Sequence, residues 1–333
     1  MTDSSPLERG VFTLSLDLEL IWGTLDLFGA DGFRRRCEIE RQVVVDRLLT
    51  LLAEFQIPAT WCVIGHLFLD RCYRENGRKH PGIVRPRHAR SRGDWFAADP
   101  DGTEEDAPLF LGRSLVEKVR ACPIPQEIGA HSFSHVIFGD PGCSRETAQG
   151  EVRACVAAAL DMGISLRSFS FPRNQVGHLE VLAEQGFRCF RGPEPRWYQD
   201  PRMPDLVRRL AHLWDVLVVA EPPVVLPRRA REGIFDIPGS MVYLPIHGIR
   251  RLIPVSWRVR RAVRGLEAAA RDRRIFHLWA HPTSFADETD AMFHGLRRIL
   301  EHVRLLRDRN LIRVVSMDAV AALVEPVMRR SVR

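Results

Sequence analysis

The feature that most constrains the fold is an alternation of short apolar segments with longer amphipathic ones along nearly the whole chain. Residues 11–20 and 58–65 have the β-rich composition of strands, and residues 38–55 between them carry apolar side chains at helical spacing. Further strands are expected at 127–130, 167–171, 188–190, 233–238, 275–280 and 312–315, and helices at 145–162, 177–185, 258–271, 290–307 and 317–324. About eight strands alternating with helices predict an α/β fold, a parallel TIM-like β/α barrel, rather than two domains.

Two segments interrupt this alternation. Residues 77–108 are rich in Pro, Gly, Asp and Arg, and this length indicates a lid or binding loop. Residues 191–257 are rich in proline and have apolar patches at 214–219 and 224–226, which we interpret as a long excursion near the mouth of the barrel. We therefore expect one domain over residues 1–333, with two insertions in a barrel core of about 11–325.

Composition narrows the cellular setting. The net charge is +6 with basic and acidic residues interleaved, which argues against a nucleic-acid partner but is compatible with an anionic membrane surface or a phosphorylated substrate. The 7 cysteines include no C-x-x-C pair and are expected to be reduced thiols. Neither a signal-peptide pattern nor a membrane-length apolar run occurs. We predict a cytoplasmic protein, soluble or peripheral at the inner membrane face, with no prediction of oligomeric state.

Polar side chains gather where predicted strands end. In Asp17-Leu18-Glu19 the two carboxylates are two residues apart, so on an extended strand both can face the barrel interior. His131 and His135 follow another strand, and an i, i+4 pair at such a place can direct two ring nitrogens at one metal ion. These four residues are the first candidates for a functional site, because catalytic groups of β/α barrels lie at the carboxyl ends of the strands.

Two further strand ends add to this set. The sequence Ser-Phe-Pro-Arg-Asn at 170–174 delivers Arg173 and Asn174. In the strand at 275–280 and the residue after it, alternation places His277, Trp279 and His281 on one face.

Two histidines and one carboxylate are a known ligand set for catalytic zinc, with coordination positions left for water and substrate. The remaining carboxylate and histidine would supply a general base and a general acid. Together these groups are the equipment of a metal-dependent amide hydrolase.

The ordered combination D-x-E, H-S-x-x-H, F-P-R-N and H-P resembles the polysaccharide deacetylases of the NodB-homology class, carbohydrate esterase family 4, over roughly residues 11–325. The resemblance implies a distorted (β/α)7 barrel and removal of acetyl groups from N-acetylated sugars. It also implies Asp17 as general base, Glu19, His131 and His135 as metal ligands, and His281 as general acid. We predict a divalent metal, with Zn²⁺ the first candidate and Co²⁺ or another divalent ion the alternative.

The chain departs from the family pattern at two motifs. The usual opening motif has two adjacent aspartates, whereas here the second carboxylate is the longer Glu19, two residues on. The usual third motif reads R-x-P-Y and its arginine orients the base. Here the order is F-P-R-N, so we hypothesise that Arg173 takes that role from a shifted position.

Plainer interpretations stay open for several residues. Asp17 and Glu19 could face solvent on an edge strand, and His281 could be a structural histidine beside a proline. His277 is a pocket-lining candidate, and nothing in the spacing of His66 raises it above a structural role. Trp95, in the first insertion, could stack on a sugar ring or simply pack locally.

The sequence thus predicts a metal-dependent deacetylase acting on an N-acetylated or N-formylated amino sugar, with Asn174, Trp279, His277 and Trp95 as substrate-binding candidates. A nucleotide-linked or lipid-phosphate-linked sugar fits a protein inside the cell better than a finished wall polymer. Two alternatives remain: an allantoinase-like or imide-hydrolysing enzyme on the same fold, and a catalytically silent carbohydrate-binding protein.

Overall fold

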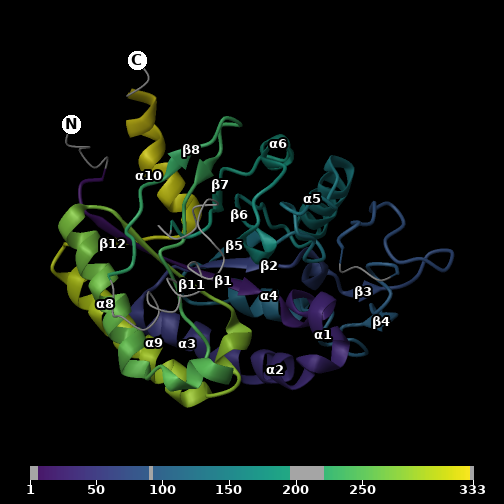
Figure 1. Ribbon diagram of the computed structural model, residues 1–333, viewed down its shortest axis with the longest axis horizontal. Helices are drawn as coiled ribbons and strands as arrows, with labels where there is room; N and C mark the ends of the chain where they lie inside the picture. Colours follow the sequence, from purple (N-terminus) through teal and green to yellow (C-terminus); the bar gives the residue numbers. More distant parts are fainter. Residues whose placement is uncertain (1–6, 90–92, 196–220, 331–333) are drawn as a thin grey trace.

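A single curved, largely parallel sheet forms the centre of the computed structural model, which describes residues 7–89, 93–195 and 221–330 (Figure 1). The order along the sheet is β10-β11-β1-β2-β5-β6-β7-β9-β8, with β12 also paired to β1. The strands are β1 (Gly10–Leu18), β2 (Thr60–Val63), β5 (Glu127–Ala130), β6 (Ser168–Ser170), β7 (Cys189–Arg191), β8 (Arg228–Arg229), β9 (Phe235–Asp236), β10 (Met241–Val242), β11 (Ile275–Ala280) and β12 (Ile312–Val314). The pairing of β8 with β9 is antiparallel, and the other pairs are parallel. The predicted distorted α/β barrel is confirmed.

Strand β1 is a central strand of this sheet, because it pairs with β2, β11 and β12. All 9 of its residues are buried, as expected for a parallel strand with both faces covered. This burial rules out the alternative that Asp17 lies on a solvent-facing edge strand. The strand ends at Leu18, two residues earlier than predicted, and Glu19 begins a 3-10 turn, η1 (Leu20–Gly23).

Helices cover the outer side of the sheet (Figure 1). They are α1 (Leu25–Gly32), α2 (Arg34–Ile39), α3 (Val45–Phe55), α4 (Arg113–Arg120), α5 (Arg145–Asp161), α6 (Leu179–Glu184), α8 (Val255–Asp272), α9 (Thr289–Asp308) and α10 (Met317–Arg330), with a π-helical turn at Glu40–Val44 between α2 and α3. Helix α9 is typical, since it buries Met292, Leu296, Ile299 and Val303 at helical spacing. Each such side chain contributes about 1.5–3 kcal/mol through removal of apolar surface from water. Most predicted helices agree with the observed ones within a few residues, although α10 extends six residues beyond its predicted end. Helices α1 and α4 and most of α2 were not predicted.

Short 3-10 turns follow the carboxyl ends of four strands. They are η1 after β1, η3 (Gly65–Phe68) after β2, η4 (Pro172–Asn174) after β6 and η7 (Pro282–Phe285) after β11. A proline opens η4 and η7, where its fixed φ suits the first helical position. The turns keep the residues after each strand close to the end of the sheet, which is where the polar side chains were expected.

The first insertion contains a strand pair of its own and buries several of its side chains. Strand β3 (Arg71–Cys72) pairs with β4 (Gly102–Thr103), and the segment between them buries Lys79, Phe96 and Asp99. In Figure 1 it lies at the opposite end of the molecule from α8.

The second insertion contains β8, β9, β10 and η6 (Gly248–Leu252). Its predicted apolar patch at 214–219 lies outside the described residues. The patch at 224–226 is partly internal, because Val225 is buried and bridges to Ile275. Within the described part of the chain, no helix has the length and apolar character needed to cross a membrane.

Candidate metal centre and active site

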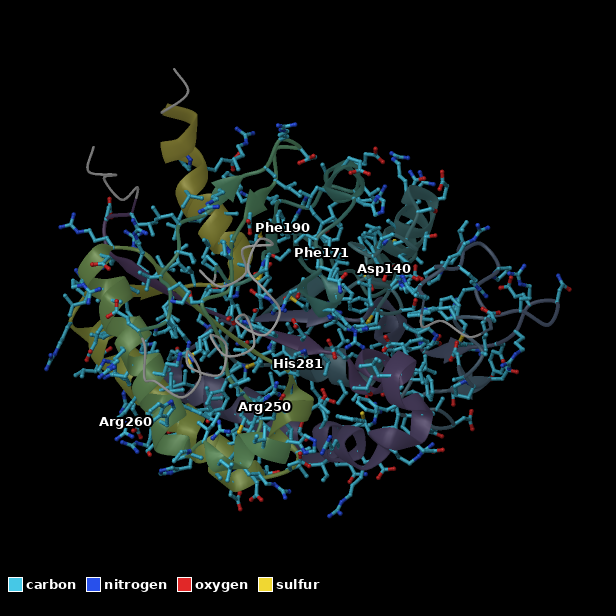
Figure 2. All side chains as sticks on the ribbon, viewed as in Figure 1. Asp140, Phe171, Phe190, Arg250, Arg260 and His281 are labelled. Carbon is cyan, nitrogen blue, oxygen red and sulfur yellow. The ribbon has the colours of Figure 1, made fainter. Side chains whose placement is uncertain are left out.

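Five of the predicted residues converge at the carboxyl ends of β1, β5 and β11. Oε1 of Glu19 lies 2.9 Å from Nε2 of His131, 3.5 Å from Nε2 of His135 and 3.5 Å from Nε2 of His281. Ligand atoms of Glu19, His131 and His135 all lie within 4.8 Å of one another, and Nε2 of His281 is 3.8 Å from Oδ2 of Asp17. Figure 2 shows His281 near the middle of the molecule, below Phe171 and Phe190.

The hydrogen bonds of His131 favour a cation in this cluster. Its Nδ1 donates to the carbonyl oxygen of Ser170 at 2.8 Å, since a carbonyl can only accept. Burial lowers the pKa of His131, but the carboxylates of Asp17 and Glu19 outweigh burial and raise the pKa above its ordinary value, which shows that this position favours positive charge. A neutral ring has only a lone pair at Nε2, and this lone pair faces the carboxylate of Glu19. A divalent ion bound by both groups would satisfy them without a buried imidazolium, and the hydrogen bond to Ser170 would orient the ring. The donor set therefore fits a metal ion.

The two carboxylates differ in their partners. Asp17 is held by Arg191, whose Nη1 donates to Oδ1 at 2.9 Å and whose Nη2 donates to Oδ2 at 2.5 Å. Both side chains are buried. Burial raises the pKa of Asp17, but the Arg191 guanidinium and nearby histidines outweigh this, so the pKa lies below its ordinary value. With Asp17 occupied, Glu19 is the carboxylate that faces the histidine pair.

The longer side chain of Glu19 has room because residue 23 is glycine. A Cβ at Gly23 would lie 1.7 Å from Oε2 of Glu19, so any larger residue would displace the carboxylate. Burial raises the pKa of Glu19, but the nearby His281 and His135 lower it by more. The resulting pKa is well below the ordinary value for a glutamate. Glu19 is therefore an ionised, anchored oxygen donor.

A buried glutamate on α5 holds the turn that carries both histidines. Glu151 accepts hydrogen bonds from the backbone N–H groups of Phe133 and Ser134 and from Oγ of Ser134. Ser132 and His135 have φ angles of 58° and 64°, a backbone region that is costly for residues other than glycine. Glu151 thus stabilises a strained turn that sets the positions of His131 and His135.

Glu151→Leu is expected to destabilise the fold and weaken metal binding, because each buried N–H left without a partner costs ~1–3 kcal/mol. Glu151→Gln keeps the shape and the accepting oxygen and is the matched control. Burial raises the pKa of Glu151 from 4.5 to about 7, so wild-type stability falls as pH rises through that window, and Gln removes this fall. Urea unfolding at several pH values and Zn²⁺ titration test both effects; equal stability of the Leu and Gln variants would show that the glutamate does not hold the turn.

Arg173 does not contact Asp17, contrary to the sequence-based hypothesis. It donates to Asp26 at 2.7 Å, whereas Arg191 holds Asp17. Sequence reasoning missed Arg191 because it comes from β7, which lies across the barrel from β1, and its Cys-Phe-Arg-Gly context matches none of the four motifs quoted above. A charged residue ending a buried apolar strand was the available signal.

The remaining predicted residues surround this pair. His277 is fully buried, and its Nε2 lies 2.9 Å from Oγ of Ser15, which also accepts from Arg191. Burial, followed by the Arg191 charge, lowers the pKa of His277 to about 3, so the ring is neutral. His277 therefore contacts the Arg191–Asp17 pair through Ser15. Because its side chain is fully buried, the prediction that it lines the substrate pocket is corrected.

Trp279 and Asn174 also border Arg191. The Arg191 guanidinium lies 4.3 Å from the centroid of the Trp279 ring, whose Nε1 donates to Glu194 at 2.9 Å. Oδ1 of Asn174 is 3.5 Å from Nη2 of Arg191. Both residues can therefore fix the arginine as well as contact a substrate.

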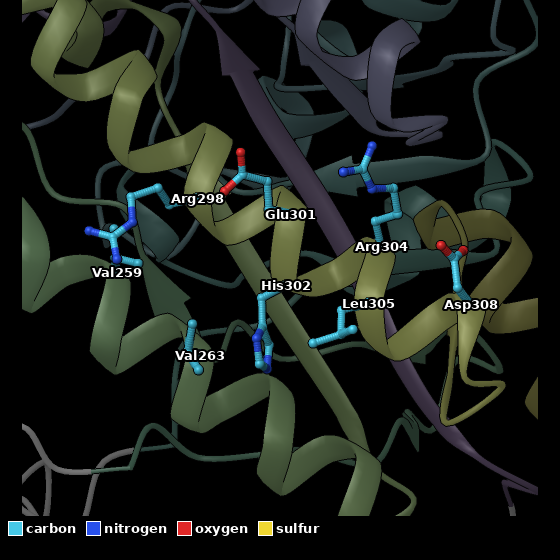
Figure 3. A pocket seen from close by; sticks show the side chains of 8 residues that line it. All are labelled: Val259, Val263, Arg298, Glu301, His302, Arg304, Leu305 and Asp308. Carbon is cyan, nitrogen blue, oxygen red and sulfur yellow. The ribbon is translucent and has the colours of Figure 1, made fainter.

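A cavity of about 190 Å³ lies beside the cluster, lined by Trp22, Asp26, Trp95 and Ser134 among others. Nε1 of Trp95 donates to Oγ of Ser134 at 2.9 Å, next to His135 in the sequence. A larger cavity of about 460 Å³ lies between α8 and α9 (Figure 3), lined by Arg298, Glu301 and His302 among others. None of the residues predicted to bind metal or substrate lines the larger cavity, so the first is the better candidate for substrate.

Comparison with solved structures identifies the fold. A Mycobacterium smegmatis protein assigned as a polysaccharide deacetylase superposes with a TM-score of 0.64 at 14% identity, covering 98% of this chain and 93% of the other. A Pseudomonas aeruginosa PAO1 protein assigned as a polysaccharide deacetylase gives 0.58 at 10% identity, covering 94% and 90%. This chain has the polysaccharide deacetylase fold. Puue allantoinase also gives 0.58 at 10% identity, covering 97% and 91%, so the fold alone does not choose between the two activities. No protein-family model and no curated protein matches the sequence.

Proposed function

We propose that the protein is a metal-dependent hydrolase that removes an N-acetyl or N-formyl group from an amino sugar. The observation that carries this proposal is the convergence of Glu19, His131 and His135 beside an Asp17 held by Arg191 and a partly exposed His281. Candidate metal ligands, a general base held in place and a general acid that substrate can reach would thus lie together at the strand ends of a deacetylase fold.

Glu19, His131 and His135 would hold the divalent ion, with Zn²⁺ the first candidate and Co²⁺ the second, because imidazole nitrogen and carboxylate oxygen are ligands that suit both. When bound, such an ion supplies Lewis-acid activation of water and of the acyl carbonyl.

Two side chains, Asp17 and His281, would carry out the proton transfers. Asp17 would accept the proton of the attacking water, since Arg191 keeps it ionised and fixes both of its oxygens. His281 would donate a proton to the leaving amine. Its side chain is 34% exposed while those of Asp17 and Glu19 are buried, so His281 is the member of the site that an incoming substrate can reach. Trp95, Asn174 and Trp279 would contact the sugar.

His131→Ala is expected to remove about one metal ion per chain, because a three-residue ligand set does not survive the loss of one member. The measurement is metal analysis of purified protein beside wild type. The matched control is His302→Ala, which changes a histidine on α9 that lines the larger cavity, outside this cluster. Unchanged metal content in His131→Ala would exclude this ligand assignment.

Acetate or formate release from a panel of amino-sugar conjugates, with allantoin and other cyclic ureides assayed in parallel, separates the proposed activity from an allantoinase-like one. Turnover of the ureides alone would favour the second activity. Binding of sugar without turnover in Zn²⁺- or Co²⁺-loaded protein would favour a silent carbohydrate-binding protein.

A lipid-phosphate-linked sugar is the substrate class that the surface favours. Turn η6 exposes Ile249 and Leu252 at 78% and 80%, and between them lie Arg250 and Arg251. The buried Arg258 donates to the carbonyl oxygens of Leu244, Ile253, Pro245 and Arg250, so this turn is held rigidly. Exposed aliphatic side chains beside arginines are suited to an anionic lipid surface.

The double variant Ile249→Ser, Leu252→Ser is expected to weaken binding to vesicles containing anionic lipid by about tenfold or more, since each buried CH₂ contributes ~0.8 kcal/mol. Vesicle co-sedimentation measures this effect. The matched control is Leu305→Ser, an exposed leucine on α9. Equal sedimentation of the control and the double variant would remove the support for a membrane-borne substrate.

A further inference from the structure

A second group of metal-ligating side chains lies in the first insertion, away from the candidate active site. It consists of His66 on η3, Cys72 on β3, and His80 and Asp99 from the segment between β3 and β4, and one ligand atom from each lies within 4.8 Å of all the others. Oδ2 of Asp99 is 3.1 Å from Nε2 of His66, 3.2 Å from Sγ of Cys72 and 3.6 Å from Nε2 of His80, and Sγ of Cys72 is 3.2 Å from Nε2 of His80.

The four separations given above are within about 0.2 Å of those in a tetrahedral site. Zinc bonds to nitrogen, sulfur and oxygen of ~2.0–2.3 Å place the ligand atoms of a tetrahedron ~3.3–3.8 Å apart. Two imidazoles, a thiol that becomes a thiolate and a carboxylate are all ligands that zinc accepts. The side chains of His66, Cys72 and Asp99 are buried, and His80 is only partly exposed, as a closed structural site requires.

The two ring nitrogens of His66 both face oxygen acceptors. Nδ1 donates to the carbonyl oxygen of Phe110 at 2.9 Å, and Nε2 lies 3.1 Å from Oδ2 of Asp99, where a neutral ring presents only a lone pair to the carboxylate. This arrangement repeats that of His131, which lies between the carbonyl oxygen of Ser170 and the carboxylate of Glu19. In addition, Oδ1 of Asp99 is buried without a hydrogen-bond partner. A cation among these groups would satisfy the ring and the carboxylate together.

Lys79 is close to the cluster but is already used. Its ammonium group donates to the carbonyl oxygens of Cys72 at 3.0 Å and Pro100 at 2.7 Å, and it lies 2.9 Å from Oδ1 of Asp101. It is also 3.3 Å from Sγ of Cys72 and 3.8 Å from Oδ2 of Asp99, so it faces two of the four candidate ligand atoms. The two carbonyl oxygens and Asp101 are its nearest oxygen acceptors, and Asp101 offers it a counter-ion outside the cluster. The carboxylate of Asp99 and a Cys72 thiolate carry two negative charges, which a divalent ion would balance.

We propose that His66, Cys72, His80 and Asp99 bind a structural zinc ion that fastens the first insertion to the barrel. The ion would join η3, which follows β2, to the segment that carries Trp95, four residues before Asp99. The rings of His80 and Phe96 lie 4.8 Å apart, and those of Phe96 and Trp22 lie 6.1 Å apart. The site would thereby fix the wall of the cavity beside His135.

Cobalt substitution tests this proposal independently of the active-site metal, because the Glu19, His131 and His135 cluster contains no cysteine. Co²⁺-loaded wild-type protein is expected to show a sulfur-to-cobalt charge-transfer band in the near ultraviolet. The band should persist in His131→Ala and disappear in Cys72→Ser. Cys122→Ser is the matched control, because Cys122 is partly exposed and outside both clusters, and it should keep the band.

Zinc content provides the second measurement. Cys72→Ser and His80→Ala are each expected to lower zinc from about two ions per chain to about one, and proteolysis within residues 73–101 should become faster. His80→Ala also covers the case in which Cys72→Ser does not fold, because its ring is partly exposed. Absence of the charge-transfer band in the wild type and in folded His131→Ala, or unchanged zinc content in folded His80→Ala, would overturn the proposal.

Discussion

Asp17→Asn is expected to lower kcat by ~10²–10⁴-fold, the contribution usual for a general base, while the metal content stays at the wild-type level. Asparagine has the same shape but cannot accept the proton of the attacking water. The carboxylate lost is the one held by Arg191, and Glu19 remains in place beside His131 and His135. Turnover of the amino-sugar substrate and metal analysis are measured on the same preparation.

Asp318→Asn is the matched control for this experiment. Asp318 is a carboxylate on α10 and is paired with Arg188 rather than Arg191. It is expected to change kcat severalfold at most. The pKa of Asp17 lies below its ordinary value of 3.8, so the acid limb assigned to this base should fall below that pH. Near-normal turnover by Asp17→Asn would mean that another group accepts the proton.

Local patterns were sufficient for the barrel and for most of the candidate site. The alternation of apolar runs and amphipathic helices is a property of neighbouring residues, and it placed Asp17, His131 and His281 at strand ends. Topology then brought those ends together, because parallel strands present their carboxyl ends at one side of the sheet. The choice of Glu19 as the third ligand depends on a residue beyond the motif, Gly23, whose missing Cβ leaves room for the carboxylate.

Contacts across the barrel could not be read from the chain in this way. Arg191 reaches Asp17 from a strand that is not its neighbour in the sheet, whereas Arg173, which follows β6, turns toward α1 and pairs with Asp26. The second cluster was missed for a related reason. Its members are separated by 5, 7 and 18 residues, a spacing that lacks the C-x-x-C pair by which zinc sites are usually recognised. Only the folding of the insertion back onto η3 brings His66 to Asp99.

Arg191→Met is expected to lower the free energy of unfolding by ~3–5 kcal/mol at pH 7, because it leaves the carboxylate of Asp17 buried without its counter-ion. Methionine keeps much of the volume beside Trp279 but none of the hydrogen bonds to Ser15 and Asp17. The double variant Asp17→Asn, Arg191→Met removes the unpaired charge, so it should be more stable than Arg191→Met at neutral pH.

The stability deficit of Arg191→Met, its loss of unfolding free energy relative to the wild type, depends on pH through the pKa of Asp17. In the wild type the pKa is lowered from 3.8, so the pair stabilises the fold above that pH and is lost as pH falls through the folded-state value. Without Arg191, burial raises the pKa instead, so the variant loses stability as pH rises above 3.8. The deficit should therefore shrink from pH 7 to pH 4. Urea unfolding of the wild type and the variant at both pH values, with the same metal chelator in every sample, measures this loss of stability.

Arg188→Met supplies the control for this experiment, from the residue just before β7. Arg188 pairs with Asp318 and Glu325 and is 34% exposed, so its loss should cost no more than ~1 kcal/mol. A deficit for Arg191→Met that equals this control, or that is unchanged between pH 7 and pH 4, would mean that the buried pair does not hold Asp17 ionised. The large, pH-dependent deficit would instead show that Arg191 fixes the charge of the proposed base from across the barrel.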